Sequence, residues 1–507
     1  MNSYHSTRSR AVSCTAKEAI RTGIAPDGGL FVSDALGSEK LDVTGFTEQS
    51  YADIANSVLQ LLLPDYTADE IAACVHEAYD GTFASAEVTP LVPLVGHEAD
   101  EGRQPFVLEL FHGPTSAFKD VALQMLPRLM ARTGSTSDTP AESIMIVTAT
   151  SGDTGKAALA GFADAPGTGI TVFYPEGKVS RVQELQMTTQ TGDNVSVCGV
   201  RGNFDDAQSA VKRIFADREL AERLTERGVV LSSANSINVG RLVPQVVYYF
   251  AAYAQLLRAG AIEAGDEVEF CVPTGNFGDV LAGYYAKLLG LPVAKLIVAS
   301  DKNNVLYDFL TTGVYDRKRP FFTTISPSMD ILISSNLERM LYYLSDGDCE
   351  LVASLMEQLA HEGRYEVPAE LLARIQEVFA CGWADEDEVR AAIGSCWRDH
   401  RYVIDPHTAC GYHVLGQVPA APAARARVLL STASPYKFPR AVAESLGLDV
   451  PADDFACMEV LAKATGTTPP VQLATLQQAA VLHDDVVDVD GMASYVEHAC
   501  HAKLGQR

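Results

Sequence analysis

The sequence lacks any apolar run long enough to cross a bilayer, and its first residues, MNSYHSTRSRAVSCTAKEAI, contain no uninterrupted apolar segment of signal-peptide length. We therefore expect a cytoplasmic protein. The 10 cysteines are scattered singly without a CxxC pair, and the 11 histidines show no zincin pattern, which argues against zinc or a disulfide framework. His400, His407 and His413 lie within a short span. We assign them no metal, because their neighbouring aspartates fit exposed loop and cap chemistry at least as well.

Positive charge is also scarce. The chain has 39 Lys and Arg against 65 Asp and Glu, a formal net charge of −26. Nucleic acids and anionic membranes would be repelled by the molecule as a whole, so neither is an expected partner. Any anionic ligand requires a local positive pocket. At 507 residues and 47% hydrophobic content, we expect a soluble protein of two or three packed domains.

The pattern of hydrophobic runs predicts an α/β fold. Residues 1 to about 98 resemble a small leading domain, with a helical stretch over 51–62. From residue 105 onward, Val- and Ile-rich runs such as FVLELF, SIMIVTAT, GITVFYP and VEFCVPT alternate with helical segments. This alternation predicts parallel sheets covered on both faces, whose ligands lie beyond the carboxyl ends of the strands. Residues 340–400 read as helices over the sheet, and VLLSTASP returns the chain to it.

The first loop whose residues could bind a ligand or react is FHGPTSAFKD, which places Lys119 in the first turn of a predicted helix. A cation at a helix N-terminus opposes the macrodipole, which favours a neutral amine or an imine. For a lysine chosen at random, a solvated surface position is the far commoner explanation. This loop alone therefore does not decide the matter.

Two further loops also join a strand to a helix. TATSGDTG, residues 148–155, offers small hydroxyl residues, glycines and helix amides to a carboxylate or phosphate, although an ordinary helix cap would have the same letters. PTGNFGD, residues 273–279, has the glycines of a phosphate loop but neither the P-loop lysine nor GxGxxG spacing. A small phosphate monoester suits it better. Together the three loops supply what pyridoxal phosphate requires: an imine-forming lysine, a carboxylate nest and a phosphate cup.

The chain resembles the threonine synthase family, within the tryptophan-synthase-β-like fold type of pyridoxal-phosphate enzymes and in its longer branch. The resemblance rests on motifs in the family's order from end to end: YHSTR, GIAPDGGLFV, HGPTSAFKD, TSGDTG, GKVSRVQELQMTT, GNFDDAQ, ANSINVGRLVPQ, PTGNFGD and SPSMDILISSNLERML. It implies two parallel-sheet α/β domains and an additional N-terminal domain. The implied boundaries are 1–98 for the N-terminal domain, 99–125 with 240–507 for the large domain, and 126–239 for the small domain.

The resemblance also implies roles for individual residues. Lys119 would hold the cofactor as a Schiff base, and Thr432 would face its pyridine nitrogen. Asp153 stands near the ring hydroxyl, where many relatives have Asn; we interpret it as a feature of the longer branch. The cofactor phosphate would lie among Gly275, Asn276, Phe277, Gly278 and Asp279. The substrate would be bound by Ser151, Thr154 and Gly155 at its carboxylate, and by Lys178, Asn235, Ser236 and Arg241 at its phosphate.

The implied reaction converts O-phospho-L-homoserine and water to L-threonine and phosphate, with Lys119 as base and proton shuttle. A phospholyase of the same fold, releasing 2-oxobutyrate, is the nearest alternative. A serine or threonine dehydratase would not need the second phosphate site, and a non-catalytic cofactor-binding paralogue would not need an intact HGPTSAFKD. We expect a monomer or a homodimer.

Overall fold

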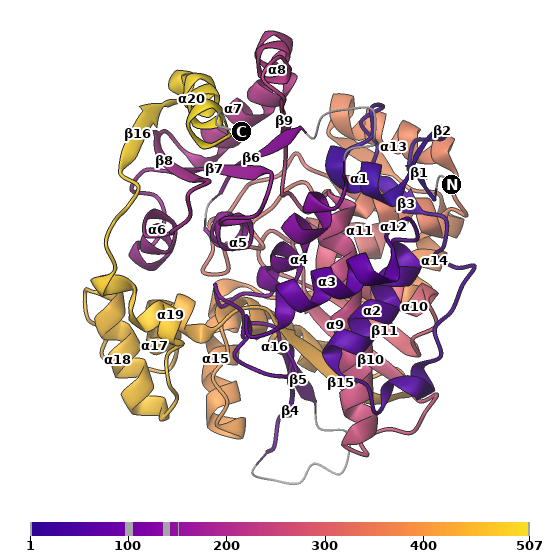
Figure 1. Cartoon of the computed structure of the whole chain (residues 1–507). Coiled ribbons are helices and arrows are strands. Elements are labelled where there is room, and N and C mark those ends of the chain that lie inside the picture. Colours follow the sequence, from indigo (N-terminus) through magenta and orange to yellow (C-terminus); the bar gives the residue numbers. More distant parts are fainter. Residues whose placement is uncertain (1–2, 97–104, 135–141, 151, 505–507) are drawn as a thin grey trace.

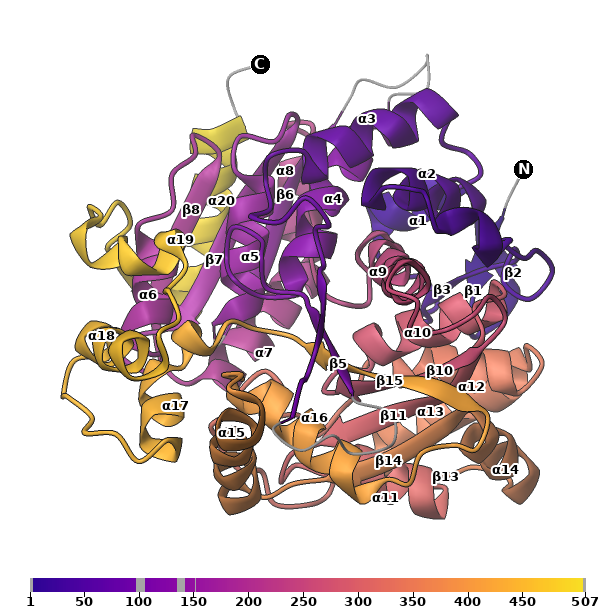
Figure 2. The ribbon, with the colours of Figure 1, turned by 90° about the horizontal axis from the view of Figure 1, so that it is seen from below.

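Two mainly parallel β-sheets, with helices between and around them, form the body of the computed structural model (Figures 1 and 2). The structure describes residues 3–96, 105–134, 142–150 and 152–504. The predicted α/β architecture is confirmed in this part of the chain. Among these residues, no helix is long and apolar enough to cross a membrane.

The larger sheet has six strands in the order β14-β11-β10-β15-β5-β4. Its strands are β4 (Leu91–Pro93), β5 (Phe106–Glu109), β10 (Glu267–Pro273), β11 (Val293–Ser300), β14 (Phe379–Trp383) and β15 (Ala424–Ser431). All pairings are parallel except that of β4 with β5. Two expectations are corrected here. β4 belongs to this sheet rather than to a leading domain ending at residue 98, and β14 lies within a segment that we expected to be helical. Five residues are too few for strand periodicity to stand out between helices.

The smaller sheet has five parallel strands in the order β16-β8-β7-β6-β9. These are β6 (Ser143–Ala149), β7 (Thr168–Pro175), β8 (Val195–Arg201), β9 (Val229–Ser232) and β16 (Asp485–Asp488). The last strand corrects the expected boundary at 240–507, because the chain returns to this sheet at its end. Helix α20 (Met492–Leu504) lies against the smaller sheet (Figure 1). It buries Met492, Val496 and Cys500 in the core of that sheet.

The N-terminal region contains an antiparallel sheet, β2-β1-β3, and helices over it. Its elements are β1 (Tyr4–Ser6), β2 (Ser9–Cys14), α1 (Ala16–Thr22), β3 (Phe31–Ser33), α2 (Tyr51–Leu62) and α3 (Ala68–Tyr79). The helix predicted over 51–62 is confirmed. The capping boxes of α1, α2 and α3, each with Ser or Thr at the N-cap and an acidic residue three positions later, explain where these helices begin. The region shares one apolar core with the larger sheet, and its helices pack on two buried helices, α2 on α9 (Val239–Arg258) and α3 on α4 (Lys119–Ala131).

Two buried helices position the site between the sheets. Helix α9 (Val239–Arg258) is apolar around almost its whole circumference, which is typical of a helix covered on all sides. Helix α4 (Lys119–Ala131) packs against α9 and against α5 (Asp153–Phe162). A Cβ at Gly161 would lie 1.9 Å from the Leu123 carbonyl oxygen, so glycine is needed for the close approach of α5 to α4.

The remaining helices cover the outer faces. Those of the smaller sheet are α6 (Arg181–Thr188), α7 (Phe204–Ala216) and α8 (Arg218–Thr225). Those around the larger sheet are α10 (Gly278–Leu288), α11 (Val305–Thr312), α12 (Leu337–Leu344), α13 (Cys349–Glu362), α14 (Ala369–Val378), α15 (Glu386–His400) and α16 (Pro406–Gln417). Strand β12 (Val314–Asp316) pairs antiparallel with β13 (Arg364–Glu366), which follows α12 and α13 in the chain. After β15, the turn η2 (Pro435–Lys437) leads to α17 (Pro439–Ser445), α18 (Asp454–Thr465) and α19 (Val471–Ala474).

Candidate active site

A cavity of about 510 Å³ lies between the two sheets, beyond the carboxyl ends of β5, β6, β10 and β15. Such crevices are where open α/β sheets bind their ligands. Twelve of the predicted site residues line the cavity: Lys119, Asp153, Thr154, Asn235, Ser236, Arg241, Gly275, Asn276, Phe277, Gly278, Asp279 and Thr432. The expected clustering of the three loops is therefore what the structure shows.

Lys119 is the first residue of α4 and is only 8% exposed. The Phe118 amide donates to the Thr432 carbonyl at 2.8 Å, which joins the lysine loop to the end of β15. Burial is the largest cause that lowers the pKa of the Lys119 amine; the charge of Asp153 opposes it, those of Arg241 and Lys437 add to it, and the resulting pKa is about 8. A lysine with this pKa is in part neutral near physiological pH, as imine chemistry requires.

Asp153 begins α5 and is held by a residue that the sequence did not single out. The Nζ atom of Lys437, from η2, lies 2.7 Å from its Oδ1 atom, and both side chains are buried. Lys437 also donates to the Thr115 carbonyl at 2.9 Å. Although burial by itself would raise the pKa of Asp153, Lys437 and then Lys119 hold it well below its usual range. The cavity therefore contains an ionised carboxylate beside its lysine.

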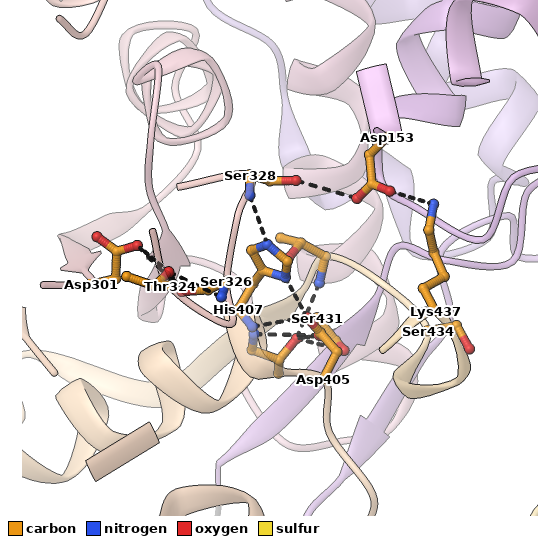
Figure 3. A network of polar contacts seen from close by, with 12 residues as sticks. Asp153, Asp301, Thr324, Ser326, Ser328, Asp405, His407, Ser431, Ser434 and Lys437 are labelled. Atoms are coloured by element: carbon orange, nitrogen blue, oxygen red, sulfur yellow. Dashed lines mark hydrogen bonds and ion pairs between the residues drawn. The ribbon is translucent and has the colours of Figure 1, made fainter. Parts of the chain in front are cut away.

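A polar network connects Asp153 to helix α16 (Figure 3). Ser328 accepts a hydrogen bond from Lys119 Nζ at 3.2 Å and donates to Asp153 Oδ2 at 3.3 Å. The Ser328 amide donates to His407 Nε2 at 3.1 Å. His407 is 2% exposed and lines the cavity, so its segment is not exposed as we expected. The expected cap is present, because Asp405 is the N-cap residue of α16.

The loop before α5 is organised around a buried hydroxyl. Thr150 Oγ1 accepts hydrogen bonds from the Gly152 and Gly155 amides, both at 3.0 Å. The Gly155 amide is therefore already engaged, and Gly155 does not line the cavity as expected of a substrate ligand. Gly152 has φ 154°, a conformation that favours glycine. The predicted ligand Ser151 lies outside the described residues.

The third loop leads into α10, whose first turn has no side-chain cap. Its N-cap residue Phe277 has φ 63°, and its ring packs on Phe379 at 5.4 Å. A Cβ at Gly275 would lie 2.9 Å from the Ser328 carbonyl oxygen. The uncapped amides of this helix can donate to an anion in the cavity.

Asp279, in the first turn of α10, turns its carboxyl group toward α9. Its Oδ1 atom accepts from Tyr248 at 2.6 Å and from Tyr249 at 2.9 Å. Its Oδ2 atom is buried and has no hydrogen-bond partner in the described part of the chain. Burial raises the pKa of Asp279 to about 6. The side chain therefore anchors the loop to α9, and the loop's backbone is the part suited to an anion.

Arg241, like Lys119, is a buried cation in the wall of the cavity. It is 5% exposed, and burial lowers its pKa to about 10. Its Nη1 atom donates to the Ala234 carbonyl at 2.8 Å, and it has no ion pair with any described carboxylate. Asn235 and Ser236 lie beside it at the cavity wall. A buried guanidinium without a carboxylate partner is suited to an anionic ligand.

Lys178 is not brought to the cavity. It follows β7 in an exposed turn, where its amide donates to the Pro175 carbonyl. The residues that sequence reasoning missed are Lys437, Ser328 and His407. Ser328 lies in the motif SPSMDILISSNLERML, and Lys437 follows VLLSTASP by two residues, but a lysine or serine in such a segment carries no signal of which neighbour it contacts.

Comparison with known proteins finds three families along the chain. The family described as "Pyridoxal-phosphate dependent enzyme" matches residues 84–432, "Threonine synthase N terminus" matches 3–79, and "Threonine synthase, C-terminal" matches 408–488. The last of these includes Thr432 and Lys437.

Individual relatives cover most of the chain. Threonine synthase from Eremothecium gossypii is 36% identical over 521 residues, which cover 97% of this chain and 97% of the relative. Human threonine synthase-like 1 is 38% identical over 91% of this chain, which spans only 62% of that relative's length. Among solved structures, pyridoxal-phosphate-bound threonine synthase from Brucella melitensis superimposes with a TM-score of 0.86 at 37% identity, covering 98% of this chain and 99% of that one.

Proposed function

The chain belongs to the threonine synthase family of pyridoxal-phosphate-dependent enzymes, and from this premise we propose that it converts O-phospho-L-homoserine and water to L-threonine and phosphate. The observation that carries the proposal is the pairing, in one cavity, of a buried lysine with a buried arginine that has no described carboxylate partner. The lysine suits the cofactor, and the arginine suits a second, phosphorylated ligand.

The cavity fits pyridoxal phosphate on its own chemistry. Lys119 is buried and has a lowered pKa, as a lysine that binds an aldehyde must. The uncapped N-terminus of α10, with Gly275 to Gly278 leading into it, fits the phosphate of the cofactor. Thr432 and Asp153 both line the cavity, where the first would offer a neutral hydroxyl to the ring nitrogen and the second a carboxylate to the ring hydroxyl.

When bound, the cofactor supplies the electron sink that makes protons next to the amino-bearing carbon acidic. Lys119, released by the incoming amino acid, accepts the proton from the substrate α-carbon through Nζ. The same Nζ atom would then take a proton from the β-carbon as the bond between the γ-carbon and phosphate breaks, and deliver one to the γ-carbon. Water would bond to the β-carbon as its hydroxyl, and Nζ would return a proton to the α-carbon. A pKa near 8 suits both halves of this shuttle.

Two sets of residues in the cavity wall would orient the substrate, one at its phosphate and one at its carboxylate. We assign the substrate phosphate to Arg241 with Asn235 and Ser236, since a guanidinium fork gives two charge-assisted bonds to one phosphate. We assign the substrate carboxylate to Thr154, in the uncapped first turn of α5, and to Ser151 on the family resemblance alone. Lys178 would have to move with the smaller sheet to contribute, so we give it no role in the geometry described above.

Product analysis tests the proposal directly. The purified protein, reconstituted with pyridoxal phosphate, should release phosphate from O-phospho-L-homoserine and form threonine in equal amount. Release of 2-oxobutyrate and ammonia would instead identify the phospholyase. The relatives favour the synthase, because a threonine synthase matches this chain over 97% of both lengths.

Borohydride trapping tests the role of Lys119. The wild-type protein should be yellow, and reduction should bleach it and fix the cofactor to Lys119 in a peptide map. Lys119→Ala should neither colour nor retain cofactor after reduction. A colourless reconstituted wild type would overturn the proposal. The cytoplasmic location and the monomeric or homodimeric assembly rest on the sequence and stay predictions.

A further inference from the structure

The hydroxyl of Ser328 occupies a central place beside Lys119. It accepts from Lys119 Nζ at 3.2 Å and donates its own proton to Asp153 Oδ2 at 3.3 Å. Because the single hydroxyl proton is used on Asp153, the lone pairs face the lysine in either of its protonation states. Ser328 therefore acts as a directional acceptor for Nζ, and it can do so only while its loop holds it in place.

The loop is held at this point by a buried imidazole. The Ser328 amide donates to His407 Nε2 at 3.1 Å, while His407 Nδ1 lies 2.8 Å from Asp405 Oδ1 (Figure 3). A carboxylate at Nδ1 favours the tautomer with its proton there, so Nε2 is left as the acceptor. The His407 ring also packs edge-on against Phe438, with centroids 5.0 Å apart.

Asp405 also links His407 to Thr432, the residue proposed to face the cofactor ring. It is fully buried and caps α16, and its second oxygen accepts from the Thr408 hydroxyl. Thr408 in turn accepts from the Thr432 amide at 3.3 Å. One carboxylate thus orients both the imidazole behind Ser328 and the residue proposed to face the cofactor ring.

We propose that His407, oriented by Asp405, is a positioning residue for Lys119, acting through Ser328. The proposal rests on the assigned role of Lys119 as proton shuttle. His407 fixes the Ser328 backbone, and the Ser328 hydroxyl keeps Nζ directed into the cavity when the lysine is free. Without this acceptor, the free lysine would sample other rotamers between proton transfers.

The titration of Lys119 in the full-length chain without cofactor tests the proposal independently of any substrate. Labelling of Lys119 with trace acetic anhydride across a pH series, followed by mass spectrometry, reports its pKa. Ser328→Ala removes an acceptor from the ammonium form and should lower that pKa. His407→Leu should lower it by a similar amount, and the double variant should show no further change, because both act on one contact.

Matched variants separate positioning from general damage. His407→Gln keeps an acceptor close to the place of Nε2 and should titrate like wild type. Ser326→Ala removes a hydroxyl of the same loop that contacts Asp301 and not Lys119, so it should also leave the titration unchanged. Ser328→Ala removes a single atom, and it keeps the test valid even where His407→Leu fails to fold.

Steady-state kinetics of the holoenzyme provide the second readout. Ser328→Ala and His407→Leu should each lower kcat about tenfold and leave KM within about twofold, the size expected for losing one hydrogen bond to a charged group. An unchanged or raised Lys119 pKa in Ser328→Ala, or a His407→Leu variant that titrates like wild type, would overturn the proposal. Failure of the assigned reaction would leave these titrations intact, so the two outcomes can be told apart.

Discussion

Arg241→Met should affect activity and stability in opposite directions. In the unliganded protein, the Arg241 guanidinium is buried, and no described carboxylate pairs with it. The charge is therefore a burden on the fold until an anion arrives. Methionine fills a similar apolar volume and removes that charge, so the variant isolates the electrostatic contribution of the side chain.

The structure sets the size of the effect. Burial lowers the pKa of Arg241 to about 10, which corresponds to ~3 kcal/mol of destabilisation of the charged form at ~1.4 kcal/mol for each tenfold change in protonation. Losing the hydrogen bond to the Ala234 carbonyl destabilises the variant by about 1 kcal/mol, which offsets part of this gain. We therefore expect the unliganded variant to be more stable by ~1–2 kcal/mol. Losing the charge-assisted bonds to the substrate phosphate should lower kcat/KM by ~100-fold or more.

Urea unfolding measures the stability of the unliganded protein without inorganic phosphate, and the stabilisation by a bound anion when phosphate is present. Phosphate should raise the midpoint of the wild type and leave that of Arg241→Met unmoved, since only a native state that binds the anion is stabilised. Arg398→Met, at an exposed arginine paired with Asp399, is the matched control and should change little in either assay. A destabilised Arg241→Met that still responds to phosphate would refute the reasoning.

Three other predictions concern buried groups around the cavity. Lys437→Met leaves the Asp153 carboxylate buried without its cation and should lower the free energy of unfolding by ~3–5 kcal/mol in the same urea assay. The double variant Lys437→Met with Asp153→Asn should recover most of this loss. Asp279 has a pKa raised to about 6, so the native state binds its proton more tightly than the unfolded chain does, and wild-type stability should fall as pH rises from about 4 to 6. Asp279→Asn should lose that slope and be ~2–3 kcal/mol more stable at neutral pH; an unchanged slope would contradict the assignment. Gly152→Ala should cost ~1–3 kcal/mol, because φ is 154° and the new Cβ would lie 2.3 Å from Gln183 Nε2, whereas Gly177→Ala, with open space around it, should cost less in thermal unfolding.

Much of the fold could be predicted because each element carries its own local signal. The βα alternation after residue 105 gave the parallel sheets, and the loops after β5, β6 and β10 were found as the places where strands end. Pairing across long separations has no such signal. β16 has only four residues and joins the smaller sheet at β8, almost 300 positions earlier in the chain. Nothing within DVVD distinguishes that partner from the edge of the larger sheet.

The residues of the candidate site also divide into those with a local sequence signal and those that only long-range contacts reveal. Lys119, Arg241 and the α10 loop stand out locally, because a cation at a helix start or a glycine-rich turn after a strand needs an explanation where it occurs. Lys437, Ser328 and His407 are ordinary residues until the fold brings them within hydrogen-bond distance of Asp153 and Lys119. Their chemistry is set by burial and by partners on other elements, as the imidazole between Asp405 and the Ser328 amide shows. Because the two sheets contribute opposite walls, the environment of Lys119 is a property of their packing, and substitutions far from position 119 in sequence should alter its proton affinity as directly as its immediate neighbours do.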